Sequence, residues 1–218
     1  MANTTFLEAV NEVLIRLRED EVSAVTDNTY SKLIGKYVND AKRQVEDSYN
    51  WNALTATITV DTSSGIYQYI MTGSGQRFRV LDVVNQEGNI FLKEETTHKM
   101  NELFLNQAVQ SGTPDRYNFN GTNSNGDTFV DLYPIPNGDY SIYFNMIVPT
   151  AALVNNTDAI LVPSEPVIFL AYSKALLERG EDAGITSTEA YQLYQQSLAD
   201  HISAEANRYP DELTWGSI

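Results

Sequence analysis

The chain has 218 residues and a mass of 24.4 kDa, with 42% apolar and 20% charged residues, a composition typical of folded, water-soluble proteins rather than disordered or fibrous ones. It contains no cysteine, which excludes disulfide frameworks, thiolate metal sites and cysteine nucleophiles. Its 14 Lys and Arg residues against 29 Asp and Glu give a formal charge of −15, which argues against a surface that binds nucleic acid through its phosphates.

Two amphipathic helices are predicted at the start of the chain. Thr5 and Glu8 have the spacing of a capping box, and apolar residues follow at intervals of three and four: Phe6, Val10, Val13, Leu14 and Leu17. The polar run 26–29 offers N-caps for a second helix, whose apolar face holds Tyr30, Leu33, Ile34, Tyr37, Val38, Ala41 and Val45. We expect an antiparallel helical hairpin that ends at Tyr49 and Trp51.

The period of the sequence changes near Leu54, where apolar residues begin to alternate with threonines. This period of two predicts a strand with one solvent-facing side. Further strands separated by Gly- and Asn-rich turns are predicted at 66–71, 78–84, 89–93, 116–119, 128–133 and 140–147. A short helix within 94–107 interrupts the series, and the number of strands indicates a small sandwich or a partly closed barrel.

Helical periodicity returns after a connector over 149–163. Pro166 near the first turn predicts the start of a very apolar helix, buried on most sides, which ends at Arg179 and Gly180. The polar run 187–189 is expected to cap a last amphipathic helix that carries Tyr191, Tyr194, Leu198 and Ile202. The remaining residues, 208–218, contain a proline and are predicted to form an extended tail.

This order of elements predicts an α+β protein with a discontinuous domain. A helical hairpin is too small to hold a core by itself, so the hairpins from both chain ends should pack together as one four-helix bundle. The predicted domains are 1–52 and 161–218 for the helical lobe, and 53–160 for an inserted, antiparallel β-rich domain.

No catalytic, cofactor-binding or metal-binding motif is found in the sequence. The two histidines, His98 and His201, have no spacing that connects them to each other or to a nucleophile. Adjacent acids such as Glu94 and Glu95 point apart and are interpreted as solvated element ends, which leaves a carboxylate-dependent hydrolase without a recognisable acid pair. We therefore expect no enzyme activity, no cofactor and no bound metal. No basic and apolar leader and no run of about 18 apolar residues is present, so cytosolic assembly is expected.

The β-rich region carries an unusual number of aromatic residues: Tyr67, Tyr69, Tyr117, Phe119, Phe129, Tyr133, Tyr140, Tyr143 and Phe144. Alternation should bury about half of them, and the others could line a contact surface. The polar segment 120–127 has no apolar residue and is interpreted as a loop that orders on contact. One functional hypothesis is therefore a carbohydrate- or peptide-binding module that uses exposed tyrosines of this domain.

A second hypothesis comes from a resemblance that spans nearly the whole chain. Several short strings, in this order, resemble the head-to-tail adaptor proteins of tailed bacteriophages, of the tail tubular protein A or gatekeeper group: Tyr49-Asn50-Trp51, the strand that begins at Leu54, Pro114-Asp115-Arg116-Tyr117, Leu132-Tyr133-Pro134-Ile135-Pro136, Leu161-Val162-Pro163, and the helix from Ala171 to Gly180.

The resemblance implies a structural virion protein at the head–tail junction, assembled in the host cytoplasm. It implies a ring of twelve copies that joins the portal protein to a tail nozzle or tail-tube protein, with DNA passing through the lumen without specific binding. Two sets of residues are nominated as contacts. The portal or neighbouring copies would contact Arg18, Glu19, Asp20, Glu21, Arg208, Tyr209 and Trp215. The tail-facing β-domain loop would contribute Asn120, Asn123, Asn125 and Asp127.

Overall fold

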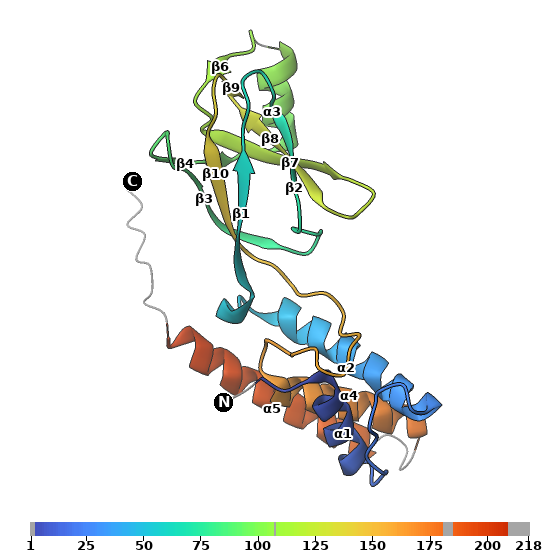
Figure 1. Cartoon of the computed structure of the whole chain (residues 1–218). Helices are drawn as coiled ribbons and strands as arrows, with labels where there is room; N and C mark the ends of the chain where they lie inside the picture. The colour runs from blue at the N-terminus through green and yellow to red at the C-terminus, as the bar shows by residue number, and fades with distance from the viewer. Residues whose placement is uncertain (1–2, 107, 181–184, 209–218) are drawn as a thin grey trace. The chain divides into compact units, whose positions relative to one another are not determined.

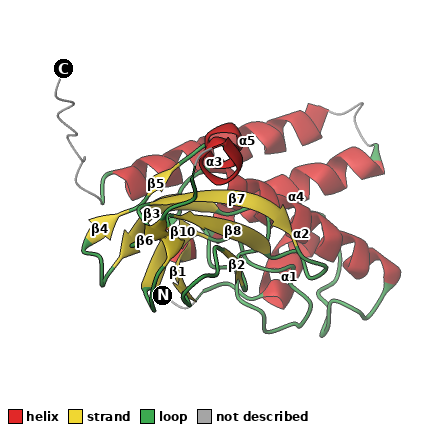
Figure 2. Ribbon diagram, turned by 90° about the horizontal axis from the view of Figure 1, so that it is seen from above, coloured by secondary structure: helices red, strands yellow, loops and turns green. Residues whose placement is uncertain are grey.

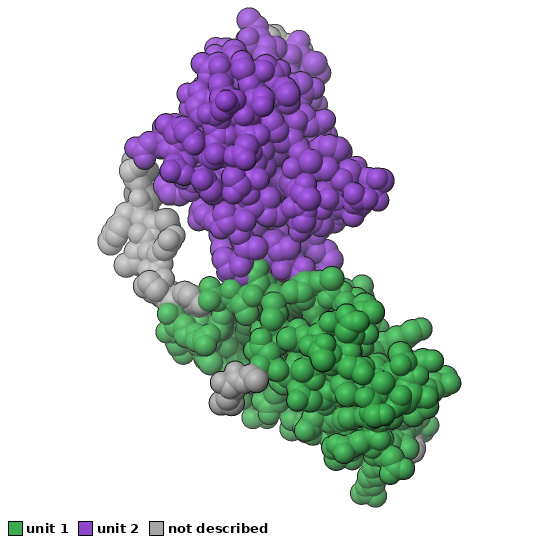
Figure 3. Space-filling view, in the orientation of Figure 1, with its two compact units in different colours: residues 1–54, 150–218 green, residues 55–149 purple. Residues whose placement is uncertain are grey.

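The structure is a computed structural model that describes residues 3–106, 108–180 and 185–208. The chain divides into two compact units (Figures 1 and 3): unit 1 comprises Met1–Leu54 and Thr150–Ile218, and unit 2 comprises Thr55–Pro149. Residues 150–160 thus belong to the helical unit. The described residues form five α-helices and three small sheets, so the protein is α+β, and none of these sheets closes into a barrel.

The N-terminal helices begin where the sequence predicts. Helix α1 spans Phe6–Arg16, and Thr5 caps it in a capping box: the Glu8 amide donates to Thr5 Oγ1 at 3.3 Å, and the Thr5 amide donates to Glu8 Oε2 at 2.8 Å. Helix α2 spans Thr29–Ser48, and its N-cap is Asn28, whose Oδ1 accepts from the Ser31 amide at 2.7 Å. Both caps satisfy amides that the first helical turn leaves without intrahelical partners.

Gly35 lets α2 approach its neighbours more closely than any other residue would. A Cβ atom at this position would lie 2.7 Å from Val25 Cγ1 and 3.1 Å from Phe6 Cζ. Alanine has the better helix propensity by about 1 kcal/mol. We nevertheless expect Gly35→Ala to destabilise the protein by about 1–3 kcal/mol, because Val25 and Phe6 are buried and have little room to move. Urea unfolding checks this prediction, and a stabilised variant would contradict it.

Helix α4, Ser164–Arg179, is the common neighbour of the other helices of unit 1. Helices α1, α2 and α5 (Ile185–Ala206) all pack on it, and α1 also packs on α2. Figure 2 shows α4 between α2 and α5. The helix ends as predicted at Gly180, whose φ of 65° is accessible to glycine without strain. One side of α4 nevertheless reaches solvent, because Leu177 is 67% exposed. Helix α5 begins two residues before its predicted cap.

Unit 2 contains two four-stranded sheets and one two-stranded sheet. The first has the order β1 (Thr55–Asp61), β10 (Ser141–Ile147), β3 (Arg79–Asn85) and β4 (Ile90–Phe91). The second has the order β2 (Gln68–Met71), β8 (Thr128–Tyr133), β7 (Arg116–Thr122) and β5 (Lys93–Glu94). The third pairs β6 (Ser111–Gly112) with β9 (Ile135–Pro136). Most pairs are antiparallel as predicted, but β5–β7 and β6–β9 are parallel.

The two larger sheets share one hydrophobic core, and neither of them closes into a barrel. The buried core residues come from both sheets and the segments beside them: Val60, Met71, Val83, Leu92, Tyr117, Val130, Leu132, Ile142, Phe144 and Met146. In β1 the predicted alternation is present, with Val60 buried and the threonines exposed. The predicted short helix consists of α3 (Thr97–Asn101) and a π-helical turn, η2 (Glu102–Asn106).

Candidate functional site

The turn after α1 holds four of the nominated contact residues. Glu19 forms an ion pair with Arg179, which lies at the end of α4 and also donates to the Tyr30 hydroxyl at 2.8 Å and to the Leu17 carbonyl at 3.3 Å. Arg18 has a positive φ of 60°, and Asp20 and Glu21 are exposed. The ion pair of Glu19 therefore holds the turn against the end of α4, whereas the carboxylates of Asp20 and Glu21 remain at the surface.

At the other end of unit 1, Arg208 lies just beyond α5 and donates to Glu205 Oε2 at 2.8 Å. The other carboxylate oxygen of Glu205 accepts from the Asn52 amide at 3.0 Å. Asn52 begins the short 3-10 helix η1 (Asn52–Leu54), at the end of the first segment of unit 1. The nominated residues Tyr209 and Trp215 lie outside the described residues.

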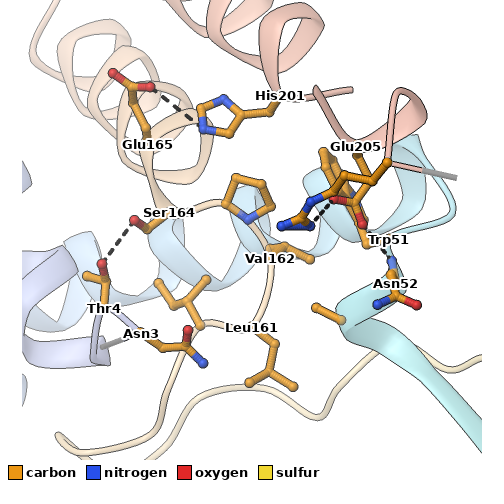
Figure 4. Close-up of a pocket in the computed structure, with 14 residues that line it drawn as sticks. Asn3, Thr4, Trp51, Asn52, Leu161, Val162, Ser164, Glu165, His201 and Glu205 are labelled. Atoms are coloured by element: carbon orange, nitrogen blue, oxygen red, sulfur yellow. Dashed lines mark hydrogen bonds and ion pairs between the residues drawn. The ribbon is translucent and has the colours of Figure 1, made fainter. Parts of the chain in front are cut away.

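A pocket of about 530 Å³ lies between the N-terminal residues, the start of α4 and the end of α5 (Figure 4). His201 Nδ1 lies 2.8 Å from the Ser197 carbonyl oxygen, and its Nε2 lies 4.0 Å from Glu165 Oε2. The Thr4 hydroxyl donates a hydrogen bond to Ser164 Oγ at 2.9 Å. The polar groups of this pocket thus serve as partners of one another, and among the described residues no cluster of His, Asp and Glu could hold a metal ion.

A buried ion pair on α2 was not predicted from the sequence. Lys42 Nζ lies 3.0 Å from Glu46 Oε1, and the side chains are 3% and 1% exposed. Lys42 also donates to the carbonyls of Thr150 and Ala151, at 3.2 and 2.9 Å, and Glu46 accepts from the Thr150 hydroxyl at 2.6 Å. The pair therefore anchors the start of the segment in which the chain re-enters unit 1. Its one signal in the sequence is that Lys42 and Glu46 directly follow Ala41 and Val45 of the apolar face.

The nominated β-domain residues lie in and beside a tight hairpin turn rather than in one long loop. Asn120 is part of β7, and its side chain donates to Asp131 Oδ2 at 2.7 Å. Asn123 Oδ1 accepts from the amides of Asn125 and Asp127, each at 2.9 Å. Asp127 in turn accepts from the Gly73 amide at 2.9 Å, which joins the turn to the loop after β2. Side chains of the segment itself thus supply hydrogen bonds that hold the turn.

Three of the nine aromatic residues named above are buried: Tyr117, Tyr133 and Phe144. Five are partly exposed, namely Tyr69, Phe119, Phe129, Tyr140 and Tyr143. Tyr67 is 43% exposed, and its ring packs 4.9 Å from that of Phe104. Tyr117, Phe119 and Phe144 form edge-on and tilted ring pairs within the core. The Tyr69 hydroxyl is bonded to the backbone of residues 63 and 66. Tyr67, Tyr69, Tyr140 and Tyr143 thus keep part of their side chains at the surface of unit 2.

Burial raises the pKa of Tyr117 to about 12, and the charge of Glu94 adds to this effect. Because the hydroxyl of an unfolded chain ionises near pH 10, the unfolded state loses its proton first as the pH rises. The contribution of Tyr117 to stability should therefore be constant below about pH 9 and decline between about pH 10 and about pH 12. Denaturant midpoints across this range measure the decline, and Tyr117→Phe should reduce it. An unchanged decline in that variant would assign the effect to other tyrosines.

Comparison with known protein families decides the identity. A family model described as SU10 adaptor protein matches residues 4–215, which includes both units. The chain belongs to the SU10 adaptor protein family. The suspected resemblance to phage head–tail adaptors is thereby confirmed. No curated protein matches the chain.

Membership of the SU10 adaptor family indicates a structural adaptor role in a phage particle. As a family of the phage head–tail junction, it implies contacts with other virion components. In the described part of this SU10 adaptor, no helix has the length and apolar character needed to span a membrane.

Proposed function

We propose that the protein forms a ring at the phage head–tail junction, in which it joins the portal protein to a tail nozzle or tail-tube protein. The observation that carries this proposal is the family match over residues 4–215, because it covers the helical unit and the inserted β unit together. Twelve copies would form the ring, and DNA would pass through its lumen without specific binding.

The two units would have different tasks in this ring. The helices of unit 1, acting as a four-helix bundle, would contact the portal and neighbouring copies. The nominated contacts there are Arg18, Glu19, Asp20, Glu21, Arg208, Tyr209 and Trp215. Unit 2 would contact the tail through Asn120, Asn123, Asn125 and Asp127. The hairpin turn supports this task, because a turn held by its own hydrogen bonds loses little conformational entropy when a partner binds.

The charge distribution is consistent with a lumen that does not hold DNA. Unit 1 has 9 Lys and Arg against 19 Asp and Glu, and unit 2 has 5 against 10, so both units are acidic, with net charges of −10 and −5. Acidic walls repel phosphates, whereas cations that captured them would resist the movement of the duplex.

The native mass of the protein, alone and mixed with the portal ring of the same virus, tests the proposal. Light scattering and negative-stain images should show a symmetric ring, free or bound to the portal, because a template can stabilise lateral contacts that are weak in solution. A protein that stays monomeric and ignores the portal at high concentration would overturn the proposal. Removal of residues 208–218 then tests the nominated tail: unchanged portal binding would exclude it from the contact.

A further inference from the structure

Unit 2 contains three Asn-Gly pairs, and the asparagine of each pair is exposed: Asn120-Gly121, Asn125-Gly126 and Asn137-Gly138. An asparagine that precedes glycine can lose its side-chain amide without an enzyme. The backbone nitrogen of the glycine attacks the asparagine Cγ, and glycine has no side chain to obstruct the attack. The reaction requires Cγ to swing onto that nitrogen. Because the three pairs share the same local chemistry, their surroundings decide which of them reacts.

Neighbouring residues hold two of the three side chains. The side-chain amide of Asn120, in β7, donates to Oδ2 of the buried Asp131 at 2.7 Å. The Tyr140 hydroxyl donates to Asn137 Oδ1 at 2.6 Å, and Thr113 Oγ1 lies 3.2 Å from the same hydroxyl oxygen. Each bond fixes the rotation of the asparagine side chain. Cγ can therefore reach the next nitrogen only after a hydrogen bond is lost.

The side chain of Asn125 forms no hydrogen bond with the described residues, although its backbone amide donates to Asn123 Oδ1 at 2.9 Å. It lies in the turn between β7 and β8 (Figure 1). The Gly126 amide donates to the Asn123 carbonyl at 3.1 Å. A single bond within a surface turn opens without disturbing the sheets. Asn125 is therefore the asparagine whose Cγ is free to reach the following nitrogen.

A cationic side chain shares a pocket with this pair. Asn125 and Gly126 line a pocket of about 400 Å³ together with Arg77. The attack places negative charge on the side-chain oxygen of Asn125, and the final product carries a carboxylate. A guanidinium in the same pocket favours both of these charges.

We propose that Asn125 is a site of spontaneous deamidation. The Gly126 nitrogen gives its proton to hydroxide and bonds to Asn125 Cγ; the Cγ–Nδ2 bond then breaks, and Nδ2 takes a proton from water and leaves as ammonia. A water molecule opens the resulting succinimide ring at one of its two carbonyl carbons, which yields aspartate or isoaspartate. The change adds one negative charge to unit 2. No step requires a ring or a portal, so the inference goes beyond the proposed function and does not depend on it.

The isoaspartate product would loosen the turn. In isoaspartate the main chain runs through Cβ and Cγ of residue 125, which adds one carbon between the amides of residues 125 and 127. Both amides bind Asn123 Oδ1 at 2.9 Å, and Asp127 also accepts from the Gly73 amide. A longer path between the two amides alters this geometry. Aged chains would thus carry a looser turn at the surface nominated for the tail contact.

Mass spectrometry of the isolated protein tests the proposal. The protein is kept at one mildly alkaline pH, folded or unfolded in guanidinium chloride, and conversion of each Asn-Gly peptide from amide to acid is followed after digestion. The unfolded chain should convert all three at similar rates. In the folded protein Asn125 should convert faster than Asn120 and Asn137 by about tenfold or more, which corresponds to about 1.4 kcal/mol of barrier. Equal rates in the folded protein, or a faster reaction at Asn120 or Asn137, would overturn the proposal.

Two variants separate the causes. Asn125→Gln keeps the amide but would have to close a six-membered ring, so conversion at this position should nearly cease while the other two peptides are unchanged. Tyr140→Phe removes the hydroxyl that holds Asn137 and should speed conversion there without changing Asn125. If Asn137 stayed as slow in Tyr140→Phe as in the natural chain, the side-chain bonds would not set the order, and the basis for selecting Asn125 would be lost. Circular dichroism establishes that both variants are folded, and mixing with the portal tests the ring separately.

Discussion

Replacing Lys42 with methionine should lower the free energy of unfolding of the helical unit by about 3–5 kcal/mol. The substitution keeps the length of the side chain but removes the cation that lies 3.0 Å from the buried carboxylate of Glu46. An uncompensated charge would remain in the interior, and the carbonyls of Thr150 and Ala151 would lose their donor. Urea unfolding followed by circular dichroism at the helix signal measures the loss.

Two variants serve as controls for this prediction. Lys36→Met makes the same chemical change on the exposed side of α2 and should alter stability by no more than about 0.5 kcal/mol. The double variant Lys42→Met with Glu46→Leu removes both charges and should recover a large part of the loss. If Lys42→Met were as mild as Lys36→Met, the ion pair would not be an anchor of the chain segment at Thr150.

Phe144→Ala should destabilise the β unit by about 3–5 kcal/mol. Phe144 is fully buried in β10, and its ring lies 5.6 Å from that of Tyr117 and 6.5 Å from that of Phe119. Its removal leaves a cavity between the two sheets and breaks the aromatic cluster of the shared core. Near-ultraviolet circular dichroism during urea unfolding reports on this packing.

The same substitution at a surface site provides the comparison. Phe91 in β4 is 74% exposed, so Phe91→Ala should change stability by at most about 0.5 kcal/mol. The two units also make the result specific, since Phe144→Ala should lower the transition of the β unit more than that of the helices. Equal effects at Phe91 and Phe144 would contradict the core position of Phe144.

The caps and helix ends were predictable because their signals are local. Each of these signals concerns residues no more than four positions apart. They are the spacing of Thr5 and Glu8, Asn28 before α2, and Gly180 after α4. Strand β8 was predicted with its observed bounds for the same reason, whereas β6 and β9, of two residues each, have no period to detect. The segment at 120–122 was misread as loop, because pairing between Thr122 and Thr128 is not visible in composition.

For the candidate contacts too, local features were predictable from the sequence and contacts between distant residues were not. The sequence predicted the charged turn at residues 18–21, but the ion pair between Glu19 and Arg179 joins positions 160 residues apart. Alternation predicted that about half of the nine aromatic residues would be buried, but not that the buried ones would be Tyr117, Tyr133 and Phe144.

The sequence by itself determined most element types, the starts of α1 and α2, the end of α4, the acidity and the resemblance to phage adaptors, since these depend on near neighbours and on composition. Only the tertiary structure decided the sheet order, the shared core of two open sheets, and the burial of Lys42 with Glu46. The physical reason is that these features depend on contacts between distant segments. A lysine followed four residues later by a glutamate reads as a solvated helix face until the segment at Thr150 covers it.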